Sequence, residues 1–287
     1  AALVAAPPRT RFVAPRPLGT RGAVVLAHGF GGGRHFLNSA LPLHGLEYFR
    51  GIGERLQRIG YDVLVTEVPA FDTVKSRAES LCEQIHAWPE RDGRRVSVLA
   101  HSMGGLDARY AISKLGIHGM VDTLLTVSTP HHGSPLADFL LTYTQPIHQV
   151  WRSIMPGLLR CMPEGGHCLS VEGAREFNKE VPDDPGVRYL SVAGDAENRI
   201  SPELRLSHHF IARHDGVAGG VNDGVVSVSS ATWGRLVETI EMDHLHQINF
   251  PFLHRWFMRS PSDDDVLETW CRLAKHATVR CEASAAA

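Results

Sequence analysis

The sequence predicts one α/β domain in which a mainly parallel central sheet is flanked by helices and carries an inserted helical region. The first observation is that short apolar segments alternate with amphipathic segments along the first half of the chain. This alternation is typical of βαβ units and a parallel sheet. The second is that the alternation stops between Ser134 and about Glu180. The third is the length of 287 residues, which suits one large α/β domain.

The expected strands are short and apolar, and turn residues separate them. They are Ala23–Ala27, Asp62–Thr66, Arg95–Ala100, Thr123–Ser128, Val187–Ala193, Val225–Val228 and Val237–Met242. The expected helices repeat apolar residues three and four positions apart, which gives each of them one apolar face. They are Tyr48–Ile59, Ser76–Ala87, Gly104–Leu115 and a C-terminal helix from Asp265.

Two segments lie outside this alternation. Residues 1–21 are rich in Pro and Arg and contain no acidic residue, so we expect an extended N-terminal arm. Residues from about 134 to 180 are apolar and partly amphipathic, and no additional set of strands accompanies them. We therefore expect residues 22–287 to form a single domain, with the segment at about 134–180 as an inserted lid or cap.

The composition excludes several classes of protein. Lys and Arg total 29 and Asp and Glu total 31, giving a net charge of −2, which argues against a general nucleic-acid binder. No apolar run reaches the roughly 18 residues of a membrane span. Five cysteines are present and none has Cys-x-x-Cys spacing, which disfavours a zinc or redox site. Free thiols and a Cys161–Cys168 bridge remain alternatives.

The strongest local signal is a serine between small residues at the end of an expected strand. The segment Ala100-His-Ser-Met-Gly104 follows that strand and precedes an expected helix. This is the context of a nucleophile elbow, with Ala100 in place of the first Gly of G-x-S-x-G. Small neighbours are needed because the serine occupies a sharp turn that exposes its hydroxyl. Ser102 is therefore the candidate nucleophile, and the N-terminus of the next helix points at the developing oxyanion.

A second turn supplies the candidate oxyanion hole. The first expected strand ends in His28-Gly-Phe30 and is followed by three further glycines. The backbone N–H groups of Phe30 and Met103 are expected to hold the tetrahedral oxyanion together. His28 precedes this turn, and we expect it to make a structural hydrogen bond rather than to act as a base.

An activated serine also needs a base and an acid that orients the base. In this architecture the acid and then the histidine follow the serine along the chain. Asp223 lies on a turn beside an expected strand and His244 lies just after one, so these two are the candidates. Asp195 is the rival acid and His246 the rival base. Asp243 adjoins His244 but is expected to point away from it.

Taken in order, these blocks resemble the bacterial true lipases of the α/β-hydrolase fold, the Pseudomonas and Burkholderia type. The resemblance runs from about residue 22 to 255, and the combination is specific although single blocks are not. The blocks are His28-Gly-Phe, Tyr48-Phe-x-Gly-Ile52, Val65-Thr-Glu-Val68, Ala100-His-Ser-Met-Gly-Gly105, Asp107-Ala-Arg-Tyr110, Ser128-Thr-Pro-His-His-Gly-Ser134, Asn222-Asp-Gly-Val and Asp243-His-Leu-x-Gln/Glu-x-Asn.

The resemblance implies an extracellular enzyme that hydrolyses triacylglycerols or other carboxylic esters through Ser102, Asp223 and His244. Its substrate would be a lipid or ester met at an oil–water interface, and a foldase partner is left open. An esterase, a thioesterase or a polyester hydrolase with the same triad remains an alternative. A non-catalytic binding protein of this fold is a remote one, because all three triad residues and both oxyanion turns are present.

The resemblance also implies that the inserted segment is a mobile lid. Its apolar side chains would cover the site in water and turn toward lipid at an interface. A fixed cap packed on the core is the alternative. The candidate lid residues are Phe139, Trp151, Ile154 and Leu158.

The family binds one structural calcium near its catalytic histidine, and this sequence departs from that pattern. An Asp two residues after the histidine is one ligand, and here that position is His246. Calcium prefers oxygen ligands, and Phe250 replaces a further one. We therefore expect no metal and no cofactor. Protein contacts would hold the loop of His244 instead, and His246, Gln247 and Asn249 are the candidates for them.

Histidine pairs such as His131-His132 and His208-His209 invite a zinc interpretation. None stands with a Cys or Glu at a recognisable metal spacing, so we expect them to serve loop packing.

Overall fold

The computed structural model describes residues 21–32, 47–142, 165–215, 220–251 and 260–279. Six strands form one sheet in the order β2-β1-β3-β4-β5-β6, and every neighbouring pair is parallel. The strands are β1 (Ala23–Ala27), β2 (Asp62–Val65), β3 (Val96–His101), β4 (Val121–Val127), β5 (Arg188–Gly194) and β6 (Arg235–Ile240).

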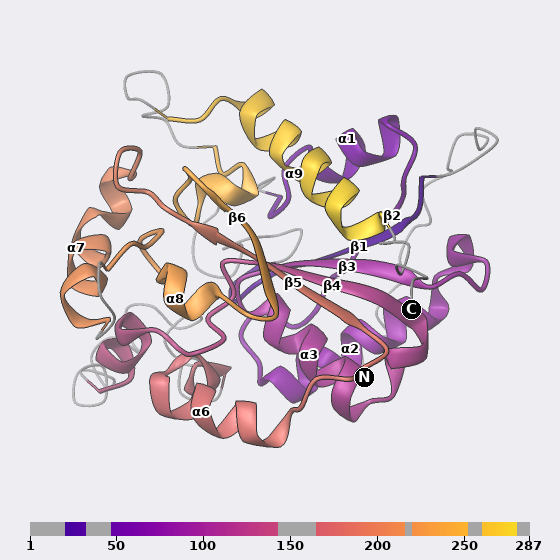
Figure 1. The fold of residues 1–287 in the computed structure, drawn as a ribbon, viewed down its shortest axis with the longest axis horizontal. Coiled ribbons are helices and arrows are strands. Elements are labelled where there is room, and N and C mark those ends of the chain that lie inside the picture. The colour runs from indigo at the N-terminus through magenta and orange to yellow at the C-terminus, as the bar shows by residue number, and fades with distance from the viewer. Residues whose placement is uncertain (1–20, 33–46, 143–164, 216–219, 252–259, 280–287) are drawn as a thin grey trace, which may run out of the picture.

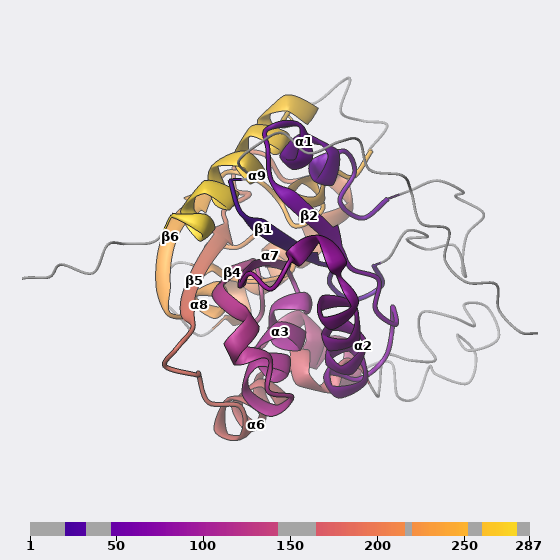
Figure 2. The ribbon, with the colours of Figure 1, turned by 90° about the vertical axis from the view of Figure 1, so that its right-hand side faces the viewer.

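Helices cover both faces of this sheet, as Figures 1 and 2 show. The helices α1 and α9 lie on one face, and α2 and α3 lie on the other. The helices are α1 (Ile52–Arg58), α2 (Val74–Ala87), α3 (Gly104–Lys114), α6 (Val171–Glu180), α7 (Arg205–His214), α8 (Val228–Ala231) and α9 (Asp263–Thr278). Short 3-10 turns are η1 (Pro89–Arg91), η2 (Ile117–Met120), η3 (His167–Leu169), η4 (Pro202–Leu204) and η5 (His246–Ile248).

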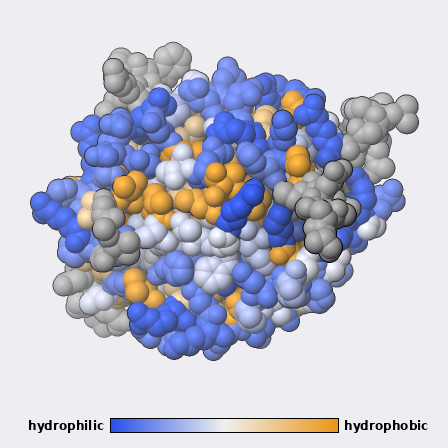
Figure 3. Space-filling view, in the orientation of Figure 1, coloured by the Kyte–Doolittle hydropathy of each residue, from blue (hydrophilic) through white to orange (hydrophobic). Residues whose placement is uncertain are grey.

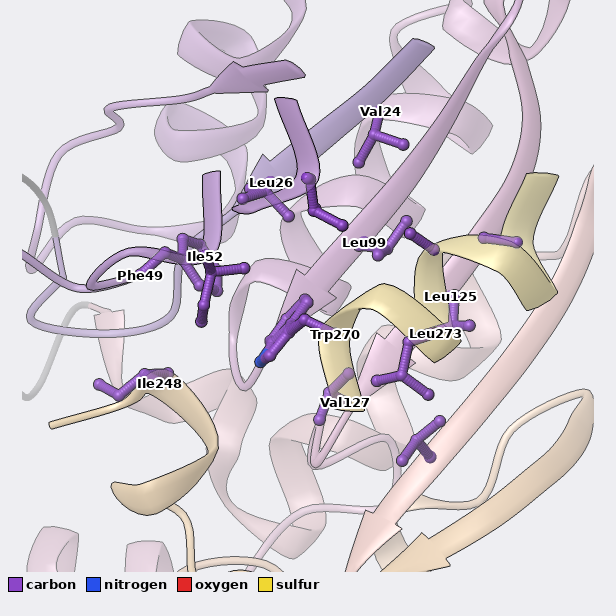
Figure 4. Packing of buried hydrophobic residues seen from close by; sticks show 14 of the residues in the cluster. Val24, Leu26, Phe49, Ile52, Leu99, Leu125, Val127, Ile248, Trp270 and Leu273 are labelled. Atoms are coloured by element: carbon purple, nitrogen blue, oxygen red, sulfur yellow. The ribbon is translucent and has the colours of Figure 1, made fainter. Parts of the chain in front are cut away.

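In the described part of the chain, the two largest apolar clusters lie on opposite faces of the sheet. Strand β1 and strand β3 are buried along their whole length, as expected for central strands covered on both faces. On one face the helix α9 supplies Trp270 and Leu273, which lie among Leu99, Leu125 and Val127 (Figure 4). On the other face Leu81, Ile85 and Ile112 of α2 and α3 pack against Val98 and Leu124.

The carboxyl ends of the strands bring the candidate residues to one edge of the sheet. In the register of β1 and β3, Ala27 pairs with Ala100, so the two following turns leave the sheet at the same level. The strand β6 ends at Ile240, four residues before His244. This is the edge at which ligands bind in open α/β sheets.

The predicted fold is confirmed, with one wrong strand and small shifts of element ends. Residues Val225–Val228 do not form a strand of the sheet. Asn222 and Ser227 make an isolated bridge, and Ser227 then caps α8 through its side chain. The Asp223 carboxylate binds the amides of Val225 and Val226, which holds this segment in a tight turn. The predicted helix from Tyr48 begins only at Ile52, after Gly51 with φ 72°.

The inserted segment is described at its two ends. Residues 135–142 are helical, and Phe139 is 42% exposed with its ring 5.2 Å from that of Phe210. The helix α6 packs Phe177 against Met103 and Leu106 of the elbow region. Three candidate lid residues, Trp151, Ile154 and Leu158, lie outside the described residues, as does nearly all of the predicted N-terminal arm. Cys161 also lies outside them, so the Cys161–Cys168 bridge stays a prediction.

Candidate active site

Ser102 occupies a strained turn between β3 and α3. Its φ is +55°, in the left-handed region that non-glycine residues rarely adopt. The backbone around it is fully used: the Ser102 amide donates to the Val127 carbonyl at 2.9 Å. The Thr129 hydroxyl donates to the Ser102 carbonyl at 2.7 Å. These bonds hold the strained residue in place, and 9% of Ser102 stays exposed.

Small residues are required around this turn because other backbone approaches it closely. A Cβ on Gly104 would lie 2.5 Å from the Ala27 carbonyl oxygen. A Cβ on Gly29 would lie 2.6 Å from the Cβ of Ser102. The turns after β1 and β3 are therefore in direct contact, which is the arrangement that the two predicted oxyanion donors need.

The turn of Phe30 is braced from outside the site. The Gly31 amide donates to the Ala70 carbonyl at 2.6 Å, and Nη2 of Arg77 donates to the His28 carbonyl at 2.8 Å. Among the described residues, no backbone carbonyl accepts from the amides of Phe30 or Met103. Within the described ranges, both amides are thus available to a ligand, as an oxyanion hole requires.

Arg77 is held by a buried carboxylate. Its Nη2 lies 2.8 Å from Oδ2 of Asp107, and both side chains are almost fully buried. Burial raises the pKa of Asp107 to about 6, although Arg77 opposes the shift. The pair links α2 and α3 to the turn of Phe30.

His28 makes the structural contacts expected of it. Its Nδ1 lies 2.9 Å from the Gly29 carbonyl oxygen, and its Nε2 accepts from the Val68 amide at 3.1 Å. Burial and then Arg77 lower the pKa of His28 to about 4. His28 is therefore a neutral structural residue.

Asp223 and His244 are brought together although 21 positions separate them in the sequence. His244 Nδ1 lies 2.7 Å from Asp223 Oδ2. The other oxygen, Oδ1, accepts from the amides of Val225 and Val226 at 2.9 and 2.8 Å. Burial opposes ionisation of Asp223, but His244 and the Val226 amide hold its pKa below the ordinary value. An ionised Asp223 fixes the proton of His244 on Nδ1 and leaves Nε2 as an acceptor.

His244 lies beside the elbow. Its ring centroid is 4.5 Å from that of His101, the residue directly before Ser102. The described structure thus gathers Ser102, His244, Asp223, Phe30 and Met103 at one edge of the sheet. Ser102 and His244 are 9% and 7% exposed, and Asp223 is fully buried.

The rival acid and base are engaged elsewhere. Nδ1 of His246 lies 2.9 Å from Oδ2 of Asp243, with both side chains fully buried. Asp243 also accepts from the amides of Ser201, Leu245 and His246, and so it turns away from His244 as expected. Asp195 accepts from the Glu197 amide, which is the contact of a turn residue.

The residues near His244 do not fit a calcium ion. Position 246 offers a buried imidazole, and its neighbour Asp243 is bound to three amides and to that ring. Asp215, the nearest acid before Asp223, accepts from the hydroxyls of Ser227 and Ser229. In the part of the chain that the structure describes, no three His, Cys, Asp or Glu side chains form a group suited to a metal.

Two of the three proposed loop contacts act directly on neighbouring elements. Gln247 donates to Asp223 Oδ2 at 3.1 Å and to the Met242 carbonyl at 3.2 Å. Nδ2 of Asn249 donates to the Arg50 carbonyl at 3.0 Å. The sequence did not predict the hydrogen bond from Gln247 to Asp223. It also did not predict that Arg77 and Thr129 bind the backbone carbonyls of the two turns. Each of these contacts joins distant segments, and no local pattern marks it.

Comparison with known proteins finds similarity to lipases. The model of the PGAP1-like alpha/beta domain matches residues 72–196. Triacylglycerol lipase 2 of Saccharomyces cerevisiae is 30% identical over 212 residues, covering 71% of this chain and 63% of that protein. The chain thus spans less than two thirds of that yeast protein. A triacylglycerol lipase of Vibrio cholerae is 28% identical over 262 residues, covering 80% of each chain.

Solved structures share the fold. The mature lipase of Bacillus licheniformis superposes with a TM-score of 0.63 at 20% identity, covering 83% of this chain and 90% of that one. The Staphylococcus hyicus lipase gives a TM-score of 0.66 at 17% identity, covering 93% and 98%. The chain therefore has the fold of these lipases.

Proposed function

We propose that this chain is a serine carboxylester hydrolase and that triacylglycerols are its substrate class. The observation that carries the proposal is the buried Asp223–His244 hydrogen bond of 2.7 Å at the sheet edge that also bears the strained Ser102. Its named relatives in yeast and Vibrio cholerae are triacylglycerol lipases. A third, from Pseudomonas fragi, is 27% identical over 273 residues, which favours the Pseudomonas type within the family.

In this mechanism Ser102 attacks the ester carbonyl while His244 Nε2 takes the hydroxyl proton. Asp223 keeps the other ring proton on Nδ1 and stabilises the imidazolium that forms. The amides of Phe30 and Met103 stabilise the oxyanion. His244 then protonates the leaving alcohol, and the acyl group remains on Ser102. Water, deprotonated by His244, releases the acid and restores the enzyme.

Exposed apolar residues near the inserted segment support a lipid substrate. Phe139 is 42% exposed and Leu206 of α7 is 87% exposed. Apolar residues also gather in the middle of the face in Figure 3. In the part of the chain that the structure describes, no helix is long and apolar enough to cross a membrane. As part of the proposal, the enzyme meets its lipid substrate at an oil–water interface in an extracellular setting.

The experiment measures hydrolysis of p-nitrophenyl esters from C2 to C16 and of emulsified triacylglycerol. Ser102→Ala should lower kcat on the order of 10⁶-fold, as removal of a triad nucleophile does. The matched control is Ser80→Ala, because Ser80 lies on α2 away from the site. A wild-type chain inert toward every ester, or a Ser102→Ala variant as active as wild type, would contradict the proposal.

The chain-length profile separates a lipase from its closest alternatives. Activity that rises toward C16 and increases once the ester exceeds its solubility indicates a lipase with a mobile lid. Activity confined to short esters, with a hyperbolic dependence through the solubility limit, indicates an esterase with a fixed cap. The packing of Phe177 in α6 on Met103 and Leu106 anchors the C-terminal end of the inserted segment in either case.

A further inference from the structure

A line of buried polar side chains connects the turn of Phe30 to Asp223. The Gly29 amide hydrogen-bonds the Tyr48 hydroxyl, and that hydroxyl lies 2.7 Å from His101 Nδ1. Nε2 of His101 lies 3.0 Å from Oε1 of Gln247. Gln247 in turn donates through Nε2 to Asp223 Oδ2 at 3.1 Å. His101 and Gln247 are fully buried and Tyr48 is 6% exposed.

The carboxylate at the end of this line fixes the direction of every hydrogen bond in it. An ionised carboxylate only accepts, so Gln247 must present its NH₂ group to Asp223. The same NH₂ group also reaches the Met242 carbonyl, which likewise only accepts. The amide oxygen of Gln247 then faces His101. Because that oxygen cannot donate, His101 carries its proton on Nε2.

The other ring nitrogen of His101 completes the chain. A neutral imidazole protonated on Nε2 has an acceptor at Nδ1, so the Tyr48 hydroxyl donates to it. Burial and then His244 hold the pKa of His101 well below its ordinary value, although Asp223 and Gln247 oppose them. The Tyr48 oxygen accepts from the Gly29 amide. The hydroxyl proton of Tyr48 is therefore free to point at His101.

We propose that Tyr48, His101 and Gln247 form a one-way chain of hydrogen-bond donors that positions Asp223, and through it His244, against the oxyanion turn. The inference rests on the proposed function, because it treats Asp223 and His244 as the acid and base. The three side chains are positioning residues that act through Asp223. Oδ2 of Asp223 receives both His244 Nδ1 and Gln247 Nε2, so the amide fixes the oxygen that orients the imidazole.

Breaking the chain at its far end gives the most specific test. Tyr48→Phe removes one hydroxyl and leaves His101 Nδ1 without its donor. The proton stays on Nε2, because the oxygen of Gln247 still only accepts, but the ring loses the hydrogen bond that fixes its position. We expect kcat to fall about tenfold, the effect of roughly one hydrogen bond, with KM unchanged. Tyr61→Phe is the matched control, because Tyr61 is equally buried and its hydroxyl bonds only weakly to Thr278 at 3.3 Å.

¹⁵N NMR of the histidine rings shows which ring nitrogen carries the proton, and so measures the direction of these hydrogen bonds without substrate. In the wild type, His101 should be protonated on Nε2 alone. Tyr48→Phe should keep that tautomer, shift the Nδ1 resonance of His101 because its hydrogen bond is lost, and move the low-field proton that His244 Nδ1 shares with Asp223. Tyr61→Phe should leave both signals in place. A purely structural role for Tyr48 would lower stability without moving the low-field proton of His244.

A second variant tests the chain at its near end. Gln247→Glu keeps the size of the side chain but places a second carboxylate against Asp223. Two carboxylates at such a distance cannot both be ionised, so we expect kcat to fall on the order of 100-fold or more, again with little change in KM. The control is Gln84→Glu, because Gln84 contacts Glu67 on the surface side of α2.

The outcomes separate this inference from the proposed function. A wild-type His101 protonated on Nδ1 would overturn the chain even if the enzyme is fully active. So would Tyr48→Phe and Gln247→Glu variants with wild-type kcat. An inactive wild type with His101 protonated on Nε2 would contradict the proposed hydrolase and retain the chain. If Tyr48→Phe does not fold, the His101 tautomer in the wild type and the kcat of Gln247→Glu test the proposal.

Discussion

The two halves of the candidate site are built by different means. The nucleophile half, formed by the turns after β1 and β3, depends on small residues and backbone hydrogen bonds around Gly29, Ser102 and Gly104. The acid–base half depends on polar side chains that reach across the structure to Asp223 and His244. Tight backbone contact leaves the first half little freedom. In the second half, the positions of the side chains depend on each of these hydrogen bonds.

Within the acid–base half, the largest expected effect comes from its carboxylate. Asp223→Asn keeps the shape but removes the charge that fixes the His244 tautomer, so kcat should fall about 10⁴-fold. Asp195→Asn is the control, because Asp195 only caps a turn, and its kcat should stay close to wild type. Kinetics on a short p-nitrophenyl ester measure both. The reverse result would assign the acid to Asp195.

This comparison also explains what the sequence could predict. The elbow was predictable because Gly104 and the strand–helix context around Ser102 are local in the sequence. Asp223 and His244 were predictable from chain order and their places near strands. The contact of Gln247 with Asp223 spans 24 positions, and that of Ser201 with Asp243 spans 42. Such pairs depend on tertiary packing, which no local periodicity records.

The same reasoning accounts for the wrong strand. Val225 and Val226 are apolar and β-branched, which favours a strand in any local scheme. The Asp223 carboxylate accepts from both of their amides, so these amides are not available to a sheet. A buried carboxylate thus overrides the local preference of the residues after it.

Acid sensitivity should be the next largest effect. Burial, as the first cause, lowers the pKa of His28 to about 4 and holds those of His101 and His131 well below 6.5. The unfolded chain binds protons at these sites near pH 6.5, whereas the folded chain does not. The free energy of unfolding therefore falls as the pH falls below about 6.5.

Asp107 has the opposite effect on the free energy of unfolding over part of this pH range. Its pKa is raised from 3.8 to about 6, so the folded state takes up that proton first as the pH falls from 6 to 4. The net uptake on unfolding is about two protons near pH 5.5, or roughly 3 kcal/mol per pH unit. Urea unfolding from pH 8 to 5 measures it. Stability that is flat or rises toward pH 5 would contradict neutral buried histidines.

A packing variant probes the nucleophile half alone. Gly104→Ala forces a methyl group to within 2.5 Å of the Ala27 carbonyl oxygen, and backbone cannot move aside as a side chain can. We expect a loss of about 1–3 kcal/mol of unfolding free energy. Gly119→Ala is the matched control, because a Cβ there meets nothing within 4 Å. Equal thermal stability of the two variants would show that the elbow is looser than this account requires.

The smallest expected effect concerns calcium and the acid–base half. We propose that the loop of His244 is held by Asp243, His246, Gln247 and Asn249 without a metal. EDTA should then change neither Tm nor activity. Differential scanning fluorimetry with EDTA, and again with added calcium, measures this. A drop of several degrees that calcium restores would show that the loop depends on the ion.

The identity of the nucleophile is the central claim, and covalent labelling tests it most directly. A fluorophosphonate reacts with a serine only where a base and an oxyanion hole activate it. Intact-mass and peptide mass spectrometry of the labelled wild type should show one adduct, on Ser102, and none in Ser102→Ala or His244→Ala. Absence of an adduct, or an adduct on another serine that persists in Ser102→Ala, would contradict the account.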